Sequence, residues 1–403
     1  MTQFFLYDDA VARRFEPFAL SRPAGELRAG ALLVRERWAR VLGLHCGGFI
    51  GAPHLADFEE FDAPPAVTAG HLPAGALVVN ARCAPSLEAL GAVDVVETDG
   101  RVAAVRLTEA TPVSRLADGT LTLEDLVSDG WTRTMALGHW LDAPWDLVRH
   151  LSAMLLDDLL ALGAGLAVAP VAGATILGSH PVWVEAGAQV EPWVVFDAQA
   201  GPILVRRGAS VAAFTRLVGP CYVAEGAQVL GGRVGTSAIG EQCRVHGEVS
   251  TTIFIGYANK GHDGFVGHSV LGRWVNLGAS TVTSNLKNTY GPVQLWTPGG
   301  QQSTGLQFLG TLFGDHAKTA IGTRLTTGCV VGTGANVVGA GLTPKVVSPF
   351  WWGEGEALYD PERFAAVAAR MMARRGVTLG DGGRRHLARV FAARWSARWS
   401  ARE

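Results

Sequence analysis

Residues 205–229 read VRRGASVAAFTRLVGPCYVAEGAQV, and this stretch decides the fold of the second half of the chain. An aliphatic residue recurs at every sixth position. A six-residue period fits neither an α-helix nor a plain β-hairpin. It is typical of a coil with three flat sides, in which every sixth residue points into a narrow prism. The aliphatic positions here are Val205, Val211, Leu217, Val223 and Val229.

The same spacing continues on both sides of this stretch. Because each coil of such a prism buries its apolar face only against its neighbours, a long run is needed for stability. We therefore predict a left-handed parallel β-helix over 166–348, whose crossovers are an exception to the usual right-handed rule. Its other inward positions are Val184, Val190, Ile239, Val245, Leu271 and Leu277 and, after an interruption, Ile321, Val331 and Val337.

The spacing breaks at four places, where we expect loops that leave the stack. Loops on a rigid scaffold are where binding groups collect. The breaks fall at 196–204, 230–238, 251–264 and 283–320.

Size and composition limit the class of protein. At 403 residues the chain is too long for one ordinary core, so we expect two domains with extensions. Hydrophobic residues make up 48% and charged residues 17%, which is typical of a folded protein. The 51 glycines show no Gly-X-Y period and indicate many tight turns. A net charge of −2 gives no overall signal for nucleic-acid binding.

The cysteines and the apolar segments bear on location. Five widely spaced cysteines without a C-x-x-C pair favour reduced thiols over a disulfide framework or a zinc site. The N-terminal residues lack a basic region followed by an apolar run, so we expect no secretory signal. The most apolar segment, 151–163, contains Asp157 and Asp158 and is too short to span a bilayer. We expect a soluble, cytoplasmic protein without membrane insertion.

The first 107 residues have the pattern of a small α/β domain. FFLY, at 4–7, is typical of a short buried strand, and 31–44 has helical periodicity. Residues 76–80 and 93–107 favour strands, and the second of these is expected to form a hairpin turned by Asp99-Gly100.

Two further segments complete the predicted organisation. Residues 108–165 are interpreted as a connector with a helix from Trp145 to about Leu162, which has a leucine stripe on one side. Residues 349–403 form a basic tail, with ten arginines against three acids over 361–403. We interpret the tail as a solvated helix covering the end of the solenoid, in preference to a nucleic-acid or membrane contact.

The stretch 257–291, YANKGHDGFVGHSVLGRWVNLGASTVTSNLKNTYG, carries the strongest chemical signal. Acyl transfer to a sugar amine needs a base, and imidazole with a pKa of about 6.5 suits this task. Lysine suits a sugar phosphate as a compact charge, and asparagine can donate to and accept from sugar hydroxyls. His268 is the preferred base. His262, beside Asp263, is a second candidate that we interpret as a loop or phosphate-contact residue.

The pattern GHSVLG…NLGAST…SN resembles the active-site stretch of the acetyltransferase domain of the GlmU family. The resemblance implies that His268 is the catalytic base, that Lys260, Asn276 and Asn285 hold the sugar phosphate, and that no metal is required. It also implies acetyl-CoA as co-substrate, bound near Gly278 and Ala279, whose backbone amides would stabilise the oxyanion. This chain is about one hexad shorter between the histidine and Asn276. β-Helix acyltransferases of this kind are trimers, so the resemblance implies a homotrimer.

The N-terminal domain resembles a shortened sugar-1-phosphate nucleotidyltransferase. The segment FEPFALSRP, at 15–23, matches the Pro-Leu-Thr…Arg-Pro region of those enzymes. Their glycine-rich phosphate loop is replaced here by DDAVARR, at 8–14, and the lysine after the proline is Ala24. Arg13 and Arg22 are the candidate nucleotide-binding residues, and Mg²⁺ would be needed only if this domain is active. Over nearly its whole length the chain resembles the alternative GlmU-like family of bacterial sugar nucleotidyltransferases.

These features predict an acyltransferase that moves an acetyl group from acetyl-CoA to glucosamine 1-phosphate or a related amino sugar phosphate, in nucleotide-sugar biosynthesis. One alternative is a sugar-1-phosphate nucleotidyltransferase whose β-helix serves oligomerisation, or a bifunctional enzyme with both activities. Another is a non-catalytic sensor of nucleotide sugars. The shortened N-terminal domain, called the head below, argues against a nucleotidyltransferase without acyltransferase activity. The histidine-bearing stretch at 257–291 argues against the sensor.

Overall fold

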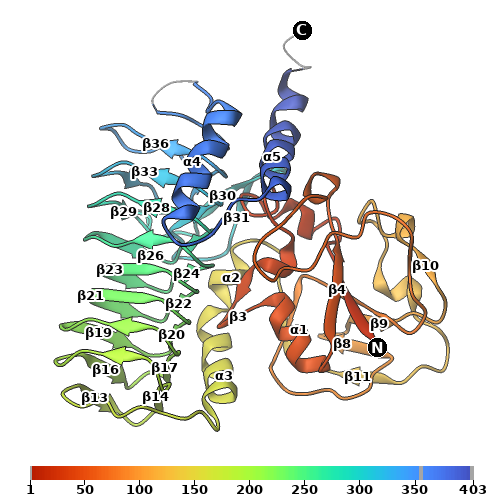
Figure 1. The fold of residues 1–403 in the computed structure, drawn as a ribbon, viewed down its shortest axis with the longest axis horizontal. Helices are drawn as coiled ribbons and strands as arrows, with labels where there is room; N and C mark the ends of the chain where they lie inside the picture. Colours follow the sequence, from red (N-terminus) through yellow and green to blue (C-terminus); the bar gives the residue numbers. More distant parts are fainter. Residues whose placement is uncertain (1, 354–356, 400–403) are drawn as a thin grey trace. The chain divides into compact units, whose positions relative to one another are not determined.

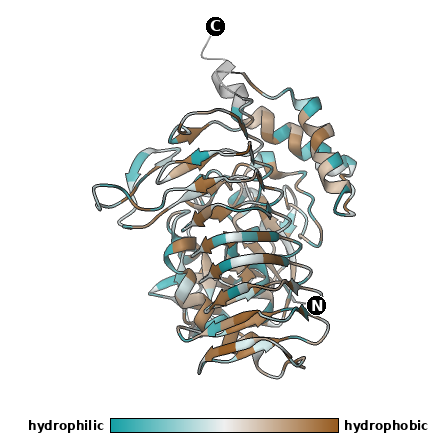
Figure 2. Ribbon diagram, turned by 90° about the vertical axis from the view of Figure 1, so that its left-hand side faces the viewer, coloured by the Kyte–Doolittle hydropathy of each residue, from teal (hydrophilic) through white to brown (hydrophobic). Residues whose placement is uncertain are grey.

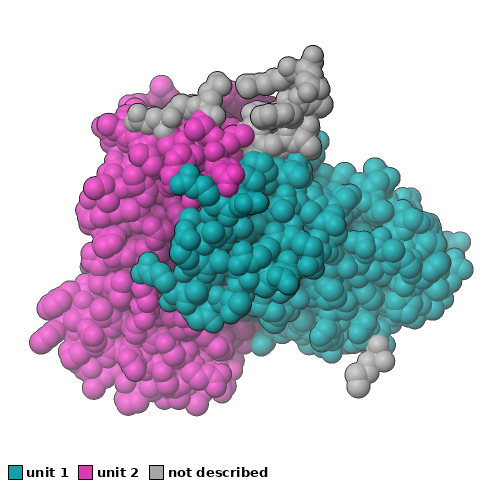
Figure 3. Space-filling view, turned by 45° about the horizontal axis from the view of Figure 1, so that its top comes forward, with its two compact units in different colours: residues 1–144, 361–403 teal, residues 145–360 magenta. Residues whose placement is uncertain are grey.

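The structure, a computed structural model, describes residues 2–353 and 357–399. The chain divides into two compact units (Figure 3). Unit 1 comprises Met1–Pro144 together with Pro361–Glu403, and unit 2 comprises Trp145–Asp360. The boundaries between the units therefore fall at Pro144 and Pro361. The sequence pattern had predicted domain boundaries at 107, 165 and 348. The first shift arises because short strands between 133 and 140 pair with earlier strands of unit 1.

Unit 1 is built on one mixed sheet of the order β11-β8-β9-β6-β1-β4. The central strand β1 pairs in parallel with β4 on one side and with β6 on the other. The predicted hairpin is confirmed, since β8 and β9 are antiparallel and both Asp99 and Gly100 have positive φ. The elements are β1 (Gln3–Tyr7), α1 (Val34–Leu42), β4 (His45–Ile50), β6 (Leu77–Asn80), β8 (Val95–Thr98), β9 (Arg101–Arg106) and β11 (Arg133–Met135).

Three two-stranded antiparallel ribbons and several single 3-10 turns surround this sheet. The ribbons are β2 (Arg28–Ala29) with β3 (Leu32–Leu33), β5 (His71–Leu72) with β10 (Thr111–Pro112), and β7 (Cys83–Pro85) with β12 (Gly138–Trp140). The 3-10 turns lie at Ala12–Arg14, Ala24–Glu26, Pro53–Leu55, Val113–Arg115 and Leu123–Leu126.

Unit 2 is a parallel β-solenoid whose coils each pass through three flat faces, and Figure 1 shows these strands stacked in order. The first face contains β15 (Gln189–Val190), β18 (Ser210–Val211), the first halves of β21 (Gln228–Gly235) and β23 (Arg244–Ser250), β25 (Asn259–Lys260), β28 (Asn276–Leu277), β33 (Lys318–Thr319) and β36 (Asn336–Val337).

The second face begins with β13 and includes the second halves of β21 and β23. Its strands are β13 (Thr175–Gly178), β16 (Val195–Ala198), β19 (Thr215–Val218), β26 (Phe265–Gly267), β29 (Val282–Thr283) and β34 (Arg324–Leu325). The third face contains β14 (Val182–Val184), β17 (Ile203–Val205), β20 (Cys221–Val223), β22 (Ala238–Ile239), β24 (Ile253–Phe254), β27 (Val270–Leu271), β32 (Thr311–Phe313), β35 (Cys329–Val331) and β37 (Val346–Val347).

The predicted inward residues of the solenoid form one continuous core, and Figure 2 looks onto the stacked strands with apolar residues recurring along the stack. All five residues that set the six-residue period at 205–229 belong to this core. The prediction for Ile321 is wrong, because its side chain is 78% exposed. The inward positions of that coil are Thr319 and Leu325 instead, two residues before and four after the predicted one.

The predicted breaks have two different physical causes. At 230–238 and 251–264 the chain stays in the stack, but sides are shorter than six residues, as the inward residues Val229, Val234 and Ile239 show. The long break is a true excursion that contains an antiparallel hairpin of β30 (Gln294–Thr297) and β31 (Gly300–Ser303). The hydrogen bond from Leu309 N–H to Asn285 O (2.9 Å) closes the base of this loop.

The helix predicted from Trp145 is present as α2 (Asp146–Arg149) and α3 (Leu151–Gly163). The predicted stripe of Leu147, Leu151, Leu155 and Leu159 is fully buried. Helix α3 packs on β17 and β20 and therefore covers part of the third face. Within the described residues, no helix has the length and apolar character needed to cross a membrane.

The basic tail forms α4 (Pro361–Ala373) and α5 (Asp381–Trp399), and both belong to unit 1. That the tail covers the end of the solenoid stays a prediction. Helix α5 contacts the 3-10 turn Pro53–Leu55, and Arg385 and Arg389 pair with Asp57. The predicted tail also includes 354–356 and 400–403, which lie outside the described residues. All five cysteines of the sequence are free thiols, as predicted, and the structure buries each of them.

Candidate functional site

His268 lies at the corner where the second face turns into the third, directly after β26. Its φ of 48° lies in the left-handed region, which bulky residues rarely adopt. Thr236 and Thr251 have the same backbone conformation, and each lies at this corner in an earlier coil. The conformation is therefore a property of the corner, and the chain uses one of these corners to present an imidazole.

Buried hydroxyl groups hold this corner in place. The Ser269 hydroxyl donates to Gly267 O (2.8 Å) and accepts from the Thr311 N–H of the next coil (3.0 Å). The Gly310 N–H donates to His268 O (2.8 Å), and the His268 N–H donates to Ser250 O (2.9 Å). The backbone on both sides of His268 is thus bound to the coils before and after it. A side chain carried here has a fixed origin, which favours catalysis by positioning.

The His268 ring lies between a polar and an aromatic neighbour. Asn285 places its Nδ2 2.9 Å from His268 Nδ1, and the exposed ring of Phe308 stacks on the imidazole at 5.3 Å. Partial burial lowers the pKa of His268 below its ordinary value of 6.5. The imidazole is therefore neutral near pH 7, which is the form that a general base requires.

The contact with Asn285 determines which ring nitrogen can act. An asparagine amide offers either a donor or an acceptor to its partner. If the amide oxygen accepts from Nδ1–H, the lone pair is on Nε2, away from Asn285. If the amide nitrogen donates to Nδ1, Nε2 carries the proton instead. Asn285 therefore sets the tautomer of His268 in addition to any contact it makes with a substrate.

Lys260 points into the prism, although the sequence indicates a surface lysine that binds phosphate. It occupies an inward position, in register with the core residue Val245 of the preceding coil, and is 2% exposed. Its ammonium donates to the carbonyl oxygens of His246, His262 and Asp263 at 2.9, 2.5 and 3.0 Å. All three donors are thus used within the chain. The role of Lys260 in phosphate binding stays a prediction, and the observed contacts tie the 261–264 corner to the stack.

We expect Lys260→Met to change how the stability of the protein depends on pH. Burial lowers the pKa of Lys260 from 10.5 to about 8. Between these values the unfolded chain binds more protons than the folded protein, so this lysine makes the free energy of unfolding rise with pH. Methionine does not titrate. The stability of the wild type relative to Lys260→Met should therefore increase across this interval in urea titrations, and a constant difference would contradict the assignment.

His262 and Asp263 lie at the corner between the first and second faces, away from the His268 corner. Both side chains are exposed, and Asp263 accepts from the Ser280 hydroxyl of the next coil (2.9 Å). This hydrogen bond is the main cause that lowers the pKa of Asp263. His262 is thus not oriented by its neighbour Asp263 and is not brought together with His268.

Gly278 and Ala279 lie at the corner between the first and second faces, one coil after His262 and Asp263. The Gly278 N–H is already used, since it donates to Thr319 O (3.1 Å). The Ala279 N–H has no acceptor among the described residues, so Ala279 is the better placed of the two to stabilise an oxyanion.

Asn276 is carried by β28 on the first face, where its Oδ1 accepts from Asn259 Nδ2 (2.9 Å). His268 and Asn285 lie at the corner between the second and third faces. The structure therefore brings His268 and Asn285 together but leaves Asn276 on another side of the same prism.

The head has its own polar cluster at the carboxyl ends of β1 and β6, the place where open parallel sheets usually bind ligands. Asp9, just after β1, pairs with Arg82 (2.7 Å) and accepts from Asn80 Nδ2 (2.9 Å). Asp8 is buried, accepts from the Ala24 N–H (3.2 Å), and has its pKa raised to about 7 by burial. Sequence reasoning missed Asn80 and Arg82, because neither belongs to a recognisable motif.

The two predicted nucleotide-binding arginines are engaged within unit 1. Arg13 donates to three backbone carbonyls, those of Asp8, Leu116 and Ala117. Arg22 is buried and pairs with Glu60 (3.0 Å). Their role in nucleotide binding stays a prediction.

Mg²⁺ does not fit the head as the structure has it. The described residues contain no group of three or more His, Cys, Asp or Glu side chains suited to a metal ion. Asp9 is neutralised by Arg82, and Asp8 is a buried carboxyl that faces a backbone N–H.

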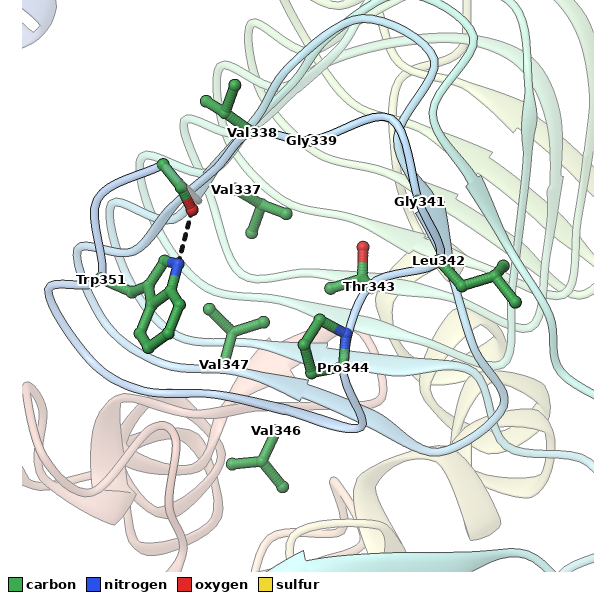
Figure 4. A pocket seen from close by; sticks show the side chains of 11 residues that line it. Val337, Val338, Gly339, Gly341, Leu342, Thr343, Pro344, Val346, Val347 and Trp351 are labelled. Atoms are coloured by element: carbon green, nitrogen blue, oxygen red, sulfur yellow. Dashed lines mark hydrogen bonds between the residues drawn. The ribbon is translucent and has the colours of Figure 1, made fainter. Parts of the chain in front are cut away.

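A cavity of about 260 Å³ opens at the C-terminal end of the solenoid (Figure 4). Its walls are mostly aliphatic, and the Trp351 indole closes one side while donating to Gly353 O (2.6 Å). None of the predicted site residues lines it. We assign it to the incomplete packing of the last coils and not to the chemistry at His268.

Comparison with known proteins bears on the first part of the chain. Residues 4–165 match the model of a protein family described as "Sugar nucleotidyl transferase". The match continues through 108–165, which the sequence pattern had suggested was only a connector. No curated protein matches the chain.

Proposed function

We propose that this chain is an N-acyltransferase for amino sugar phosphates. The proposal starts from the observation that a sugar nucleotidyl transferase domain followed by a parallel β-solenoid fits a GlmU-like two-domain protein. The acyl donor is acetyl-CoA and the acceptor is glucosamine 1-phosphate or a close relative. The observation that carries the proposal is the neutral, rigidly held His268 with Asn285 against its Nδ1. The five free cysteines agree with a cytoplasmic enzyme of nucleotide-sugar biosynthesis.

In the proposed reaction, His268 takes a proton from the ammonium group of the sugar and frees the nitrogen lone pair. The amine attacks the thioester carbonyl, and the carbonyl oxygen becomes an oxyanion facing the Ala279 N–H. The C–N bond forms and the C–S bond breaks as the intermediate collapses. The proton held by His268 passes to the leaving sulfur and the nitrogen releases its second proton to solvent, so the products are the N-acetyl sugar phosphate, free coenzyme A and one proton. No metal is required for these steps.

The proposal includes a homotrimer. His268 and Asn276 lie on different sides of one prism, so a site that uses both must combine faces of two copies. A second copy would also supply Ala279, which lies at a different corner from His268. Sedimentation equilibrium tests this part, since a monomeric mass at assay concentration would contradict it.

Nucleotidyl transfer by unit 1 is the second candidate function, because the family match at residues 4–165 covers the N-terminal part of this unit and continues through α3 of unit 2. Two observations weigh against this function. Arg13 and Arg22 already bind groups within unit 1, and Asp9 is paired with Arg82. A bifunctional enzyme would show both activities.

The deciding experiment measures two products from the purified chain. Free thiol release from acetyl-CoA is followed with glucosamine 1-phosphate, and pyrophosphate release is followed with UTP, Mg²⁺ and N-acetylglucosamine 1-phosphate. We expect thiol release without pyrophosphate. Pyrophosphate alone would move the function to the head, and both products would establish a bifunctional enzyme.

A further inference from the structure

A row of polar side chains runs along the outside of the first face. The register of the parallel strands aligns one outward residue per coil, and neighbouring strands lie about 4.8 Å apart. The row contains two cations and no acid. Its members are Gln189, Ser210, Gln228, Arg244, Asn259, Asn276, Lys318 and Asn336.

Lys318 is the most unusual member of this row. Its side chain is half-buried, and its ammonium has a single partner among the described residues, the carbonyl oxygen of His316 at 3.0 Å. An ammonium group has three donors. Two of them therefore remain available at the surface of the face. Lys260 gives the contrast within the same solenoid, since three carbonyls use all of its donors.

The neighbours of Lys318 in the row are both asparagines. Asn276 precedes it and Asn336 follows it in register, each one strand spacing away. The Asn276 oxygen is occupied by Asn259, so its Nδ2 is left to donate outward. The three adjacent side chains thus present an ammonium flanked by amide donors. This set of donors matches the oxygens of a phosphate group.

A second cation on the row supports an anionic ligand. Arg244 lies on the other side of Asn259, and its Nε is buried without a hydrogen-bond partner among the described residues. Burying an unpartnered donor has a cost in free energy. Arg244 lies three strand spacings from Lys318, so it adds positive charge to this face without contacting a phosphate bound at Lys318.

We propose that Asn276, Lys318 and Asn336 form a binding site for a phosphate monoester on the first face of the solenoid. The identification of that phosphate as the one on the sugar rests on the proposed function. The lysine that holds it is then Lys318, one coil further along than Asn276, and not Lys260.

The charge state of Lys318 agrees with this assignment. Burial lowers its pKa from 10.5 to about 8. The group is therefore still mostly charged at pH 7, although its charge is poorly solvated. A bound dianion would compensate for that loss of hydration.

Two phosphates of the proposed reaction share this chemistry, those of the sugar phosphate and of coenzyme A. The Michaelis constants distinguish them. A variant of Lys318 should raise KM for glucosamine 1-phosphate and leave KM for acetyl-CoA unchanged if the site holds the sugar phosphate. The reverse pattern would assign the site to coenzyme A.

The test uses inorganic phosphate as probe and isothermal titration calorimetry on the full chain. Lys318→Met keeps the length of the side chain and removes its charge, and Lys318→Arg restores a cation. Lys345→Met is the matched control, because Lys345 also donates to a carbonyl, that of Thr327, and lies outside the row. We expect phosphate affinity to fall about 10- to 100-fold in Lys318→Met, to recover largely in Lys318→Arg, and to be unchanged in Lys345→Met. Equal thermal unfolding midpoints would exclude misfolding as the cause.

Two results would overturn the site: phosphate binding by Lys318→Met that equals the wild type, or an equal loss in Lys345→Met. The proposed function can fail separately. If the wild type shows no thiol release but binds phosphate through Lys318, the acyl transfer is wrong and the anion site stands. If the wild type turns over while Lys318→Met keeps both phosphate affinity and KM, the site is wrong and the acyl transfer stands.

Discussion

Replacing His268 by alanine is expected to reduce the rate of acetyl transfer about 10²- to 10⁴-fold, the range that general-base catalysis contributes. The loss should appear mainly in kcat, because the ring removes a proton in the transition state while other groups hold the substrate. Thiol release from acetyl-CoA, measured with saturating glucosamine 1-phosphate, gives the rate directly.

The pH dependence of the rate provides an independent readout. Burial lowers the pKa of His268, so the wild-type rate should fall on the acid side only below the ordinary histidine pKa of about 6.5. His268→Ala should lack this acid limb. His180→Ala is the matched control, because His180 is an exposed histidine of the first coils. Acetyl transfer that survives unchanged in His268→Ala would remove the histidine from the mechanism.

Replacing Phe254 by alanine should lower the free energy of unfolding by about 3–5 kcal/mol, the usual cost of removing a buried aromatic ring. Phe254 is fully buried on the third face, in register with Leu271 of the coil that carries His268. Each coil is stabilised chiefly by its neighbours, so a cavity here weakens two interfaces between coils at once. Urea unfolding monitored by circular dichroism measures the change.

Phe214→Ala is the matched control for this substitution. Phe214 is the same residue type in the same solenoid, but its side chain is 77% exposed and stacks on Trp193. We expect a change within about 0.5 kcal/mol, as is usual for surface positions. Similar losses in both variants would mean that the prism core does not dominate the stability of unit 2.

The regular part of the solenoid could be predicted from sequence because its geometry repeats. Where each side has six residues, as at 205–229, the period itself identifies the inward side chains. The prediction for Ile321 failed because the excursion after Asn285 interrupts the count, and nothing in the intervening residues marks where it resumes. Lys260 was unexpected for a related reason. Shorter sides earlier in the solenoid shift the six-residue count, so Lys260 falls at an inward position, where a lysine contradicts the aliphatic pattern.

The candidate site was predicted in part. The Gly-His pair in the sequence identified His268, and the family resemblance identified Asn285. The structure places these two side chains in contact. Phe308 could not be found, because its contact with His268 depends on how a long loop folds back. The separation of Asn276 from His268 follows from the three sides of the coil, which the spacing of nine residues between Asn276 and Asn285 does not reveal.

The closed base of the 286–308 excursion makes the register of the neighbouring coils independent of the length of the loop. The loop leaves the stack after Asn285 and returns at Leu309, which binds back to Asn285 O, and the next residue, Gly310, binds His268 O. Entry and exit thus share one corner, so the coils on either side keep their register whatever the loop contains. An insertion or deletion within this loop should therefore leave the corner that carries His268 in place.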